Sequence, residues 1–230
     1  MTTAPLRGIS SMATRQVLAD LVAGFAQQTG LQAAIESVGG VDAAKRVAAG
    51  EVFDVVILAS DAIDKLMAAG HLLPGSKVDW VHSGVAVAVP VGAPLPDIST
   101  EDAVRNAVLA APSISLSTGP SGVAIAQLFE RWGIAEKIAS RMVQAPPGVP
   151  VGSLVAKGEV ALGFQQLSEL LHVQGIQIVG PLPPAIQITT TFSAGVGAQS
   201  QQVDAARALL AHLASPAAAD AKQKQGMTPA

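Results

Sequence analysis

The chain has 230 residues, half of them hydrophobic, so it can bury a sizeable core in one large domain or two small ones. Its formal net charge is −3 and no block of lysine or arginine stands out, which argues against a nucleic-acid-binding face. It has no cysteine, which excludes disulfides and thiolate chemistry, and its four histidines lie far apart in the sequence. We therefore expect neither a metal site nor another cofactor.

The first residues, MTTAPLR, lead directly into structured-looking sequence without a basic segment, an apolar segment or a cleavage site. No apolar run approaches the roughly 18–20 residues that span a bilayer. We expect a cytoplasmic protein without membrane insertion. A periplasmic location would follow if a signal peptide had been removed ahead of Met1.

The first third of the chain alternates strands with helices. Strands are expected at 6–9, 31–38 and 53–58, and helices at 12–28, 41–49 and 62–69. This order predicts a parallel α/β unit, in which ligands bind at the carboxyl ends of the strands. Small or hydroxyl-bearing residues stand where each strand gives way to its helix, namely Ser10, Ser11, Gly39, Gly40 and Ser60.

The run SISLSTGPSG repeats this pattern in the middle of the chain. An apolar strand leads into a group of small residues ahead of a helix, namely Ser117, Thr118, Ser121 and Gly122. One interpretation is a plain helix N-cap, which is the common role of Ser or Thr there. The other is an anion site built from backbone N–H groups at the helix start. A separate helix at 103–110 has its own start signature at Ser99 or Thr100.

Two long apolar strands, near 84–90 and 186–196, bracket a middle block of α/β character. Further helices are expected at 151–156, 167–172, 202–214 and 217–225, and further strands at 160–164 and 176–179. The chain then reads as two Rossmann-like lobes, each with a central sheet, joined by two crossover strands. The first lobe would be residues 1–83 plus 191–230 and the second 84–190, with hinge closure on a ligand cleft between them.

The order of motifs resembles that of a known family. ISSMATRQVLADLVAGFAQQTG, VGGVDAAKRVAAGEVFDVVILAS, VHSGVAVAVP, STGPSGVAIAQLFERWG and PPGVPVGSLVAKGEVALGFQQLSEL together resemble the molybdate-binding branch of the type II periplasmic solute-binding proteins. The resemblance covers essentially the whole chain. It implies the two-lobed solute-binding fold and a small anion held by hydroxyls and backbone N–H groups at helix starts.

The resemblance also implies which loops hold the ligand. By position, Ser10 and Ser11 match the first loop, Gly39 and Gly40 (with Val41) the second, Ser121 and Gly122 (with Pro120) the third, and Val149, preceded by Gly148, the fourth. The second loop lacks the serine of the family pattern, and Gln165 stands where the family places a tyrosine. These two changes point away from molybdate and toward a longer carboxylate, which takes N–H groups at one end and an amide or cation at the other. The alternative for Gln165 and Gln166 is a polar strand end facing water.

Charged candidates for the site are few. Arg15, Lys45 and Arg46 are possible cations for a carboxylate, and each has the alternative of a solvated helix face. His82, just before the first crossover strand, is the candidate catalytic residue, with a core or surface histidine as the alternative.

Two functions follow from these features. The first is a binding protein that closes on a small carboxylate or oxyanion without chemistry; the absence of a signal peptide argues against a transporter partner. The second is an isomerase on the same scaffold, because the family that the chain resembles includes an aconitate isomerase. That reaction needs a base, for which His82, Glu169 and Asp61 are candidates. A sensing module is a third interpretation, but no DNA-binding segment is visible.

Overall fold

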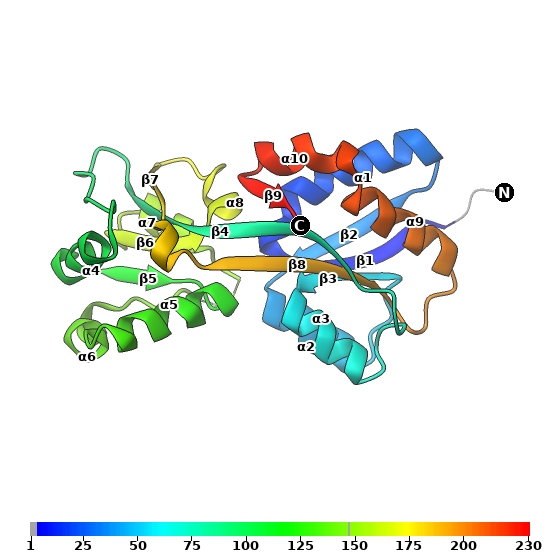
Figure 1. Cartoon of the computed structure of the whole chain (residues 1–230), viewed down its shortest axis with the longest axis horizontal. Coiled ribbons are helices and arrows are strands. Elements are labelled where there is room, and N and C mark those ends of the chain that lie inside the picture. Colours follow the sequence, from blue (N-terminus) through cyan, green and yellow to red (C-terminus); the bar gives the residue numbers. More distant parts are fainter. Residues whose placement is uncertain (1–3, 147) are drawn as a thin grey trace. The chain divides into compact units, whose positions relative to one another are not determined.

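The computed structural model describes residues 4–146 and 148–230, and it confirms the α/β class. The chain forms two compact units, which we call unit 1 (Met1–Ser83 and Thr191–Ala230) and unit 2 (Gly84–Thr190). Figure 1 shows the elements of each unit.

The strands and helices follow the order expected from the sequence. The strands are β1 (Leu6–Ser11), β2 (Ala33–Val38), β3 (Val55–Ala59), β4 (Val78–Pro90), β5 (Ile114–Leu116), β6 (Leu162–Gln166), β7 (Ile176–Pro181), β8 (Thr189–Val196) and β9 (Met227–Pro229). The α-helices are α1 (Arg15–Thr29), α2 (Gly40–Ala48), α3 (Ser60–Ala68), α4 (Glu101–Ala110), α5 (Pro120–Arg131), α6 (Ala135–Ile138), α7 (Val151–Ala156), α8 (Leu167–Leu170), α9 (Val203–Ala214) and α10 (Ala219–Lys224). Short 3₁₀ helices are η1 (Met12–Thr14), η2 (Ala139–Arg141), η3 (Pro184–Ile186) and η4 (Pro216–Ala218).

The sheet of unit 1 places three strand ends side by side. β1 lies between β2 and β3 and is parallel to both, so Ser10 is in register with Ser37 on one side and Ile57 on the other. β8 continues the sheet antiparallel to β3, and β9 pairs with the start of β4. The sheet of unit 1 is therefore mixed rather than purely parallel, because β8 runs antiparallel to its neighbour β3.

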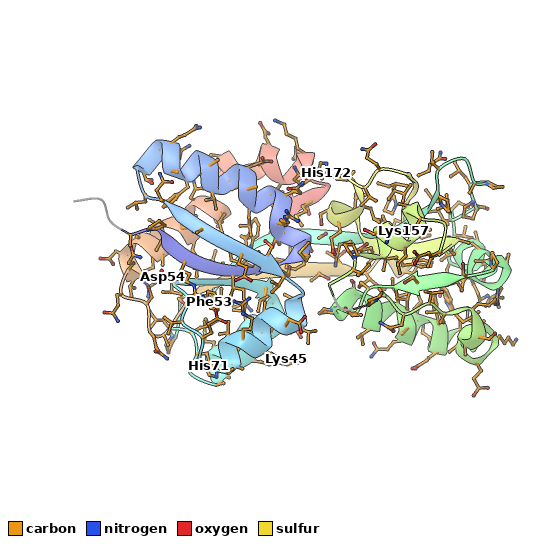
Figure 2. The ribbon with its side chains drawn as sticks, turned by 180° about the vertical axis from the view of Figure 1, so that it is seen from behind. Lys45, Phe53, Asp54, His71, Lys157 and His172 are labelled. Atoms are coloured by element: carbon orange, nitrogen blue, oxygen red, sulfur yellow. The ribbon has the colours of Figure 1, made fainter. Side chains whose placement is uncertain are left out.

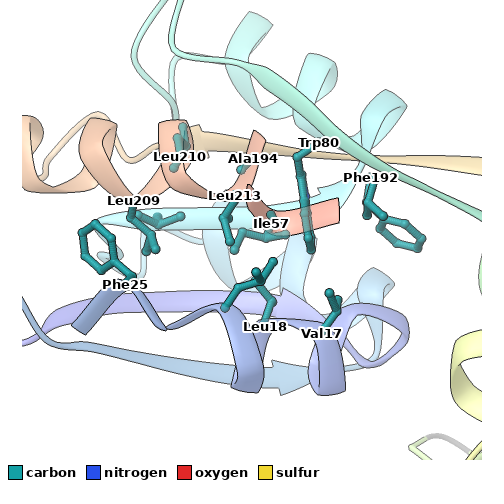
Figure 3. Packing of buried hydrophobic residues seen from close by; sticks show 14 of the residues in the cluster. Val17, Leu18, Phe25, Ile57, Trp80, Phe192, Ala194, Leu209, Leu210 and Leu213 are labelled. Atoms are coloured by element: carbon teal, nitrogen blue, oxygen red, sulfur yellow. The ribbon is translucent and has the colours of Figure 1, made fainter. Parts of the chain in front are cut away.

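Helices cover both faces of this sheet. α1, α9 and α10 pack on one face, and α2 and α3 on the other (Figure 1). Figure 3 shows Leu18 and Phe25 of α1 packed with Ile57 of β3 and with Leu209 and Leu213 of α9. Each such side chain contributes about 1.5–3 kcal/mol when fully buried, so this cluster holds the strand ends in place.

Unit 2 repeats the layered arrangement with its own core. β5 and β6 are parallel, and β6 and β7 are each antiparallel to β4. Helices α4, α5 and α6 pack on one face of this sheet, with Val108, Ile125 and Phe129 among the buried residues. Helices α7 and α8 contribute to smaller apolar clusters that include Val151 and Leu170.

Several predicted boundaries were wrong. The first strand extends through Ser10 and Ser11, so β1 ends at Ser11 rather than at Ile9. The helix expected from Met12 begins at Arg15, because the first three residues form a 3₁₀ turn. The strand expected from Ile186 begins at Thr189, since Pro184 starts another 3₁₀ turn. β9 was missed, because three residues give too short a pattern to recognise.

Two predicted helix caps were confirmed. Gly30 ends α1 in the left-handed conformation with a φ of 73°, as expected for a glycine C-cap. Thr100 caps α4, and its Oγ1 accepts a hydrogen bond from the Ala103 N–H at 3.1 Å. Across the described residues, no helix is both long enough and apolar enough to cross a membrane.

Candidate functional site

The predicted residues of unit 1 gather at the carboxyl ends of its three parallel strands. Ser11 ends β1, Gly39 and Gly40 follow β2, and Ser60 follows β3. A Cβ built on Gly40 would lie 3.5 Å from the Ser11 Cβ, so the starts of η1 and α2 are in contact. Parallel pairing therefore brings together residues that are about 50 positions apart in the sequence.

The two neighbouring serines of β1 have different environments. The Ser10 hydroxyl is fully buried and shares a hydrogen bond with the Ser37 hydroxyl at 2.7 Å. The Ser11 Oγ is also buried, but it has no hydrogen-bond partner among the described residues. Successive side chains of a strand point to opposite faces, which explains the difference. A buried hydroxyl without a partner is costly and is suited to receive a ligand atom.

The helices that begin at this edge also have N-terminal backbone N–H groups without a side-chain cap from the described residues. α2 begins after Gly39 and α3 after Ala59, and no described side chain caps either start. Their first N–H groups therefore remain available to an acceptor. The Asp42 carboxylate lies close to the start of α2, where a Cβ at Gly39 would be 3.3 Å from its Oδ2. α4, which belongs to no predicted site, is capped by Thr100.

In unit 2, the plain N-cap interpretation of Ser117 and Thr118 was wrong. α5 takes Gly119 as its N-cap residue, with no cap hydrogen bond from the described side chains, and Pro120 is its first residue. The Ser117 Oγ instead shares a hydrogen bond with the Ser121 Oγ at 3.0 Å. Gly122 is required there, because a Cβ would overlap the Ser117 carbonyl oxygen.

The loop at Gly148 and Val149 makes a tight turn. Gly148 has a φ of 76°, which favours glycine, and the Val149 N–H donates to the Pro146 carbonyl at 3.0 Å. The Val149 side chain packs against the cluster that holds α7. Its backbone N–H is therefore engaged within the loop and its side chain has a packing role, while the ligand contact of Val149 stays a prediction.

Gln165 and Gln166 do not face water, so that interpretation was wrong. Each is only 3% exposed, because β6 lies inside the sheet of unit 2. The Gln165 Oε1 accepts the Gly152 N–H at 2.9 Å, and its Nε2 donates to the Glu169 Oε2 at 2.8 Å. The Gln166 Nε2 donates to the Thr190 Oγ1 at 2.8 Å.

Glu169 has the most unusual carboxyl environment. Its side chain is partly exposed, but burial raises its pKa from 4.5 to about 7, and the Gln165 hydrogen bond opposes that rise. By contrast, a hydrogen bond from Arg46 lowers the pKa of both Glu36 and Glu51. The sequence named Glu169 only as one of three candidate bases. The spacing of four from Gln165 was a weak signal, because the two residues lie in different elements.

Of the three candidate cations, Arg46 is already engaged. It donates to Glu36 at 2.7 Å and to Glu51 at 2.7 Å, and its guanidinium lies 5.5 Å from the centroid of the Phe53 ring. Arg15 and Lys45 are exposed, consistent with solvated helix faces. The structure therefore gives no support to Arg46 as a ligand for a carboxylate.

Comparison with known proteins identifies the family. Residues 6–228 match the family model described as bacterial extracellular solute-binding protein. The chain belongs to this family. An aconitate isomerase from Pseudomonas sp is 39% identical over 227 residues, covering 96% of this chain and 86% of that protein. The family resemblance predicted from the sequence is therefore confirmed.

Solved structures give the same fold. The periplasmic molybdate-binding protein of Azotobacter vinelandii matches with a TM-score of 0.80 at 22% identity, covering 97% of this chain and 98% of that one. The sulfate-binding protein of Mycobacterium tuberculosis matches with a TM-score of 0.79 at 17% identity, covering 99% of this chain and 87% of that one. At these identities, the likeness establishes the solute-binding fold.

The remaining candidate bases of this solute-binding family member lie in unit 1. The His82 Nδ1 is 3.0 Å from the Thr191 Oγ1, and His82 is in register with Thr228 of β9. Asp61 is exposed and pairs with Lys65 at 3.4 Å. The catalytic role of His82 stays a prediction.

A small pocket of about 60 Å³ lies at the other end of β3, lined by residues that include Phe53 and His71. Figure 2 shows these two side chains beside Asp54, which precedes β3. The pocket is thus at the amino end of the strand, whereas the predicted site is at the carboxyl end. In residues 4–146 and 148–230, no three His, Asp or Glu side chains are grouped so as to hold a metal ion.

Proposed function

We propose that this chain binds a small polycarboxylate and moves a carbon–carbon double bond within it by proton transfer, as an aconitate isomerase does. The observation that carries the proposal is the 39% identity to the Pseudomonas aconitate isomerase over 96% of the chain. An identity of this size over nearly the whole length favours a shared reaction as well as a shared fold.

The residues at the strand ends supply suitable chemistry. The Ser11 hydroxyl, which lacks a partner among the described residues, and the first N–H groups of α2 and α3 are donors for a carboxylate. Removing a proton from a carbon next to a carboxylate builds negative charge on that carboxylate. Fixed donors of this kind stabilise the charge and lower the barrier.

Anion binding without turnover is the second candidate function. The family description names solute binding, and the structural relatives are named for binding molybdate and sulfate. The second loop (Gly39, Gly40 and Val41) lacks the serine of the molybdate-binding pattern, and Gln165 stands in place of its tyrosine. Both differences favour a carboxylate over those oxyanions.

Thermal unfolding in the presence of candidate anions tests both functions. The set is molybdate, tungstate, sulfate, citrate, cis-aconitate and trans-aconitate. A ligand at 100 times its Kd adds about 2.7 kcal/mol to the free energy of unfolding, which raises the Tm by roughly 5–10 °C for a chain of this size. We expect both aconitates to stabilise the protein and the three inorganic oxyanions to have no effect.

Proton NMR of each aconitate with the protein then separates the two functions. Interconversion of the cis and trans isomers supports the isomerase. If aconitate stabilises the protein but its isomers do not interconvert, the result supports the binding function and refutes the isomerase function. Stabilisation by none of the anions refutes both.

A further inference from the structure

We propose that Glu169 is the catalytic residue that carries the proton in the double-bond shift, and that Gln165 is the residue that positions it. This inference rests on the proposed isomerase function and names the group that performs its chemistry. Both residues belong to unit 2, and the argument uses only contacts within that unit.

The Gln165 side chain is held at both ends. Its Oε1 accepts the Gly152 N–H at 2.9 Å, so its amide nitrogen must face the other way, toward the Glu169 Oε2 at 2.8 Å. Because Gln165 is only 3% exposed, this orientation is not exchanged for hydrogen bonds to water. The amide therefore fixes one oxygen of the Glu169 carboxyl.

The elements around Glu169 provide no counter-charge. α7, β6, β7 and residues 84–90 of β4 contain no ionisable side chain, and Leu170 packs with alanines of β4 on this face of the sheet. The nearest ionisable residues along the chain are His172, three positions later, and Glu159, ten positions earlier, followed by Lys157; all three are exposed. Figure 2 labels His172 and Lys157. The causes of the raised pKa are burial and, in opposition, the hydrogen bond from the neutral Gln165.

This environment differs from that of a structural carboxylate. Glu101 accepts the Trp132 Nε1–H at 2.6 Å and lies 3.4 Å from the Arg131 guanidinium, and these contacts lower its pKa. A partly exposed carboxyl in apolar surroundings without a cationic partner destabilises the fold when it ionises, so a purely structural role does not account for it.

The protonation state of Glu169 fits its proposed task. With a pKa of about 7, the carboxyl exists in both forms near neutral pH, so it can accept a proton and return it. The side chain is partly exposed. Asp61, by comparison, is exposed and paired with Lys65.

The step balances without an oxidant or a reductant. The Glu169 carboxylate removes a proton from the methylene carbon that lies between a substrate carboxylate and the carbon–carbon double bond. The electron pair of that C–H bond spreads over the three-carbon allyl unit and into the attached carboxylates. The protonated Glu169 then gives a proton to the far carbon of the allyl unit, the double bond moves by one position, and the residue returns to its starting state.

Glu169→Gln tests the proposal, with Glu159→Gln as the matched control because Glu159 is an exposed carboxylate of the same unit. Each protein is mixed with trans-aconitate in D2O, and NMR follows interconversion and deuterium incorporation. We expect Glu169→Gln to keep the aconitate-induced rise in Tm and to lose at least about 100-fold in rate, as for removal of a general base. Glu159→Gln keeps the wild-type rate.

Gln165→Ala tests the positioning role through a pH profile. Since the Gln165 hydrogen bond lowers the pKa of Glu169, its loss moves the apparent pKa of the rate upward. A slower rate with an unmoved pKa overturns the positioning role of Gln165.

The outcomes separate this inference from the function on which it rests. A Glu169→Gln rate within about threefold of the wild-type rate overturns the role of Glu169 and leaves the isomerase standing. A wild-type protein that binds aconitate but neither isomerises it nor exchanges its protons overturns both. Should the Gln variant fail to fold, Glu169→Asp keeps the carboxyl one methylene shorter, and an undiminished rate in that folded variant overturns the proposal.

Discussion

The two units carry different functional groups at the carboxyl ends of their parallel strands. In the described part of unit 1, the ends of β1, β2 and β3 carry a hydroxyl, glycines and helix starts without side-chain caps, none of which is charged. In unit 2 the end of β6 carries an amide that is bonded to a carboxyl. The strand ends of unit 1 therefore offer hydrogen-bond donors, whereas the strand end of unit 2 also offers a carboxyl with a raised pKa.

Their charged residues are also arranged differently. Arg7, Arg46, Glu36 and Glu51 form a network of ion pairs, in which both guanidiniums lie over the Phe53 ring. Both carboxylates, Glu36 and Glu51, are engaged in these ion pairs, which gives them a structural role. In unit 2 the apolar surroundings of Glu169 hold its carboxyl without a cation. The carboxylates of this network in unit 1 are engaged in ion pairs, whereas Glu169, which has a hydrogen bond but no cationic partner among the described residues, is the candidate for proton transfer.

The largest expected effect on stability is at Gly122, near the start of α5, where the loop after β5 leaves no space for a side chain. Gly122→Ala places a Cβ onto the Ser117 carbonyl oxygen, which requires the loop or α5 to move. We expect a loss of more than about 3 kcal/mol in the free energy of unfolding, as for severe overpacking. Urea denaturation measures it. Gly119→Ala is the control, since its Cβ would meet nothing within 4 Å, and an equal loss there would contradict the explanation.

The second effect concerns the pH dependence of stability. Because the folded-state pKa of Glu169 is raised from 4.5 to about 7, the folded state binds the proton more tightly, and the contribution of Glu169 to stability falls as pH rises through this range. We therefore expect Glu169→Gln to be more stable than wild type at pH 8 by roughly 3 kcal/mol. The two proteins should converge near pH 4.5. Urea denaturation of both proteins at pH 4.5 and pH 8 measures this. A difference in the free energy of unfolding that is the same at both pH values would show that Glu169 is not the titrating group.

The third effect separates Ser11 from Ser10 in unit 1. Ser11→Ala removes a buried hydroxyl without a described partner, so stability should be unchanged, while affinity for aconitate falls about 10-fold with the loss of one hydrogen bond to a charged group. Ser10→Ala breaks the bond to Ser37 and should cost about 1 kcal/mol of stability. Calorimetric titration gives the affinities. Unchanged binding by Ser11→Ala would remove Ser11 from the site.

The smallest effect tests the difference between capped and uncapped helix starts. Thr100→Ala removes the cap of α4 and should lower the free energy of unfolding by about 1 kcal/mol, with the affinity for aconitate unchanged. Thr118→Ala, next to the start of α5, should leave stability nearly unchanged because Thr118 provides no cap hydrogen bond. A comparable loss in both variants would show that α5 is also capped by a side chain.

Much of the fold was predictable from the sequence because the signals are local. The apolar run at 53–58, the glycine after α1 and the threonine before α4 each act within a few residues. What was not predictable depends on strands that meet from far apart. β9 pairs with residues about 145 positions earlier, and the mixed direction of the sheet in unit 1 follows from the return of the chain through β8.

The sequence by itself determined the α/β class, the family and the group of small and hydroxyl-bearing residues at the strand ends. The α/β class and the strand ends follow from hydrophobic periodicity and local turn chemistry, whereas the family follows from the resemblance of whole motifs to those of a known family. Only the tertiary structure decided which of two adjacent serines keeps a free hydroxyl, that Gln165 is buried, and that Glu169 lies in apolar surroundings. The physical reason is that a hydrogen bond or a pKa is set by neighbours in space, and Ser37 and Gly152 come to these side chains from other elements of the fold.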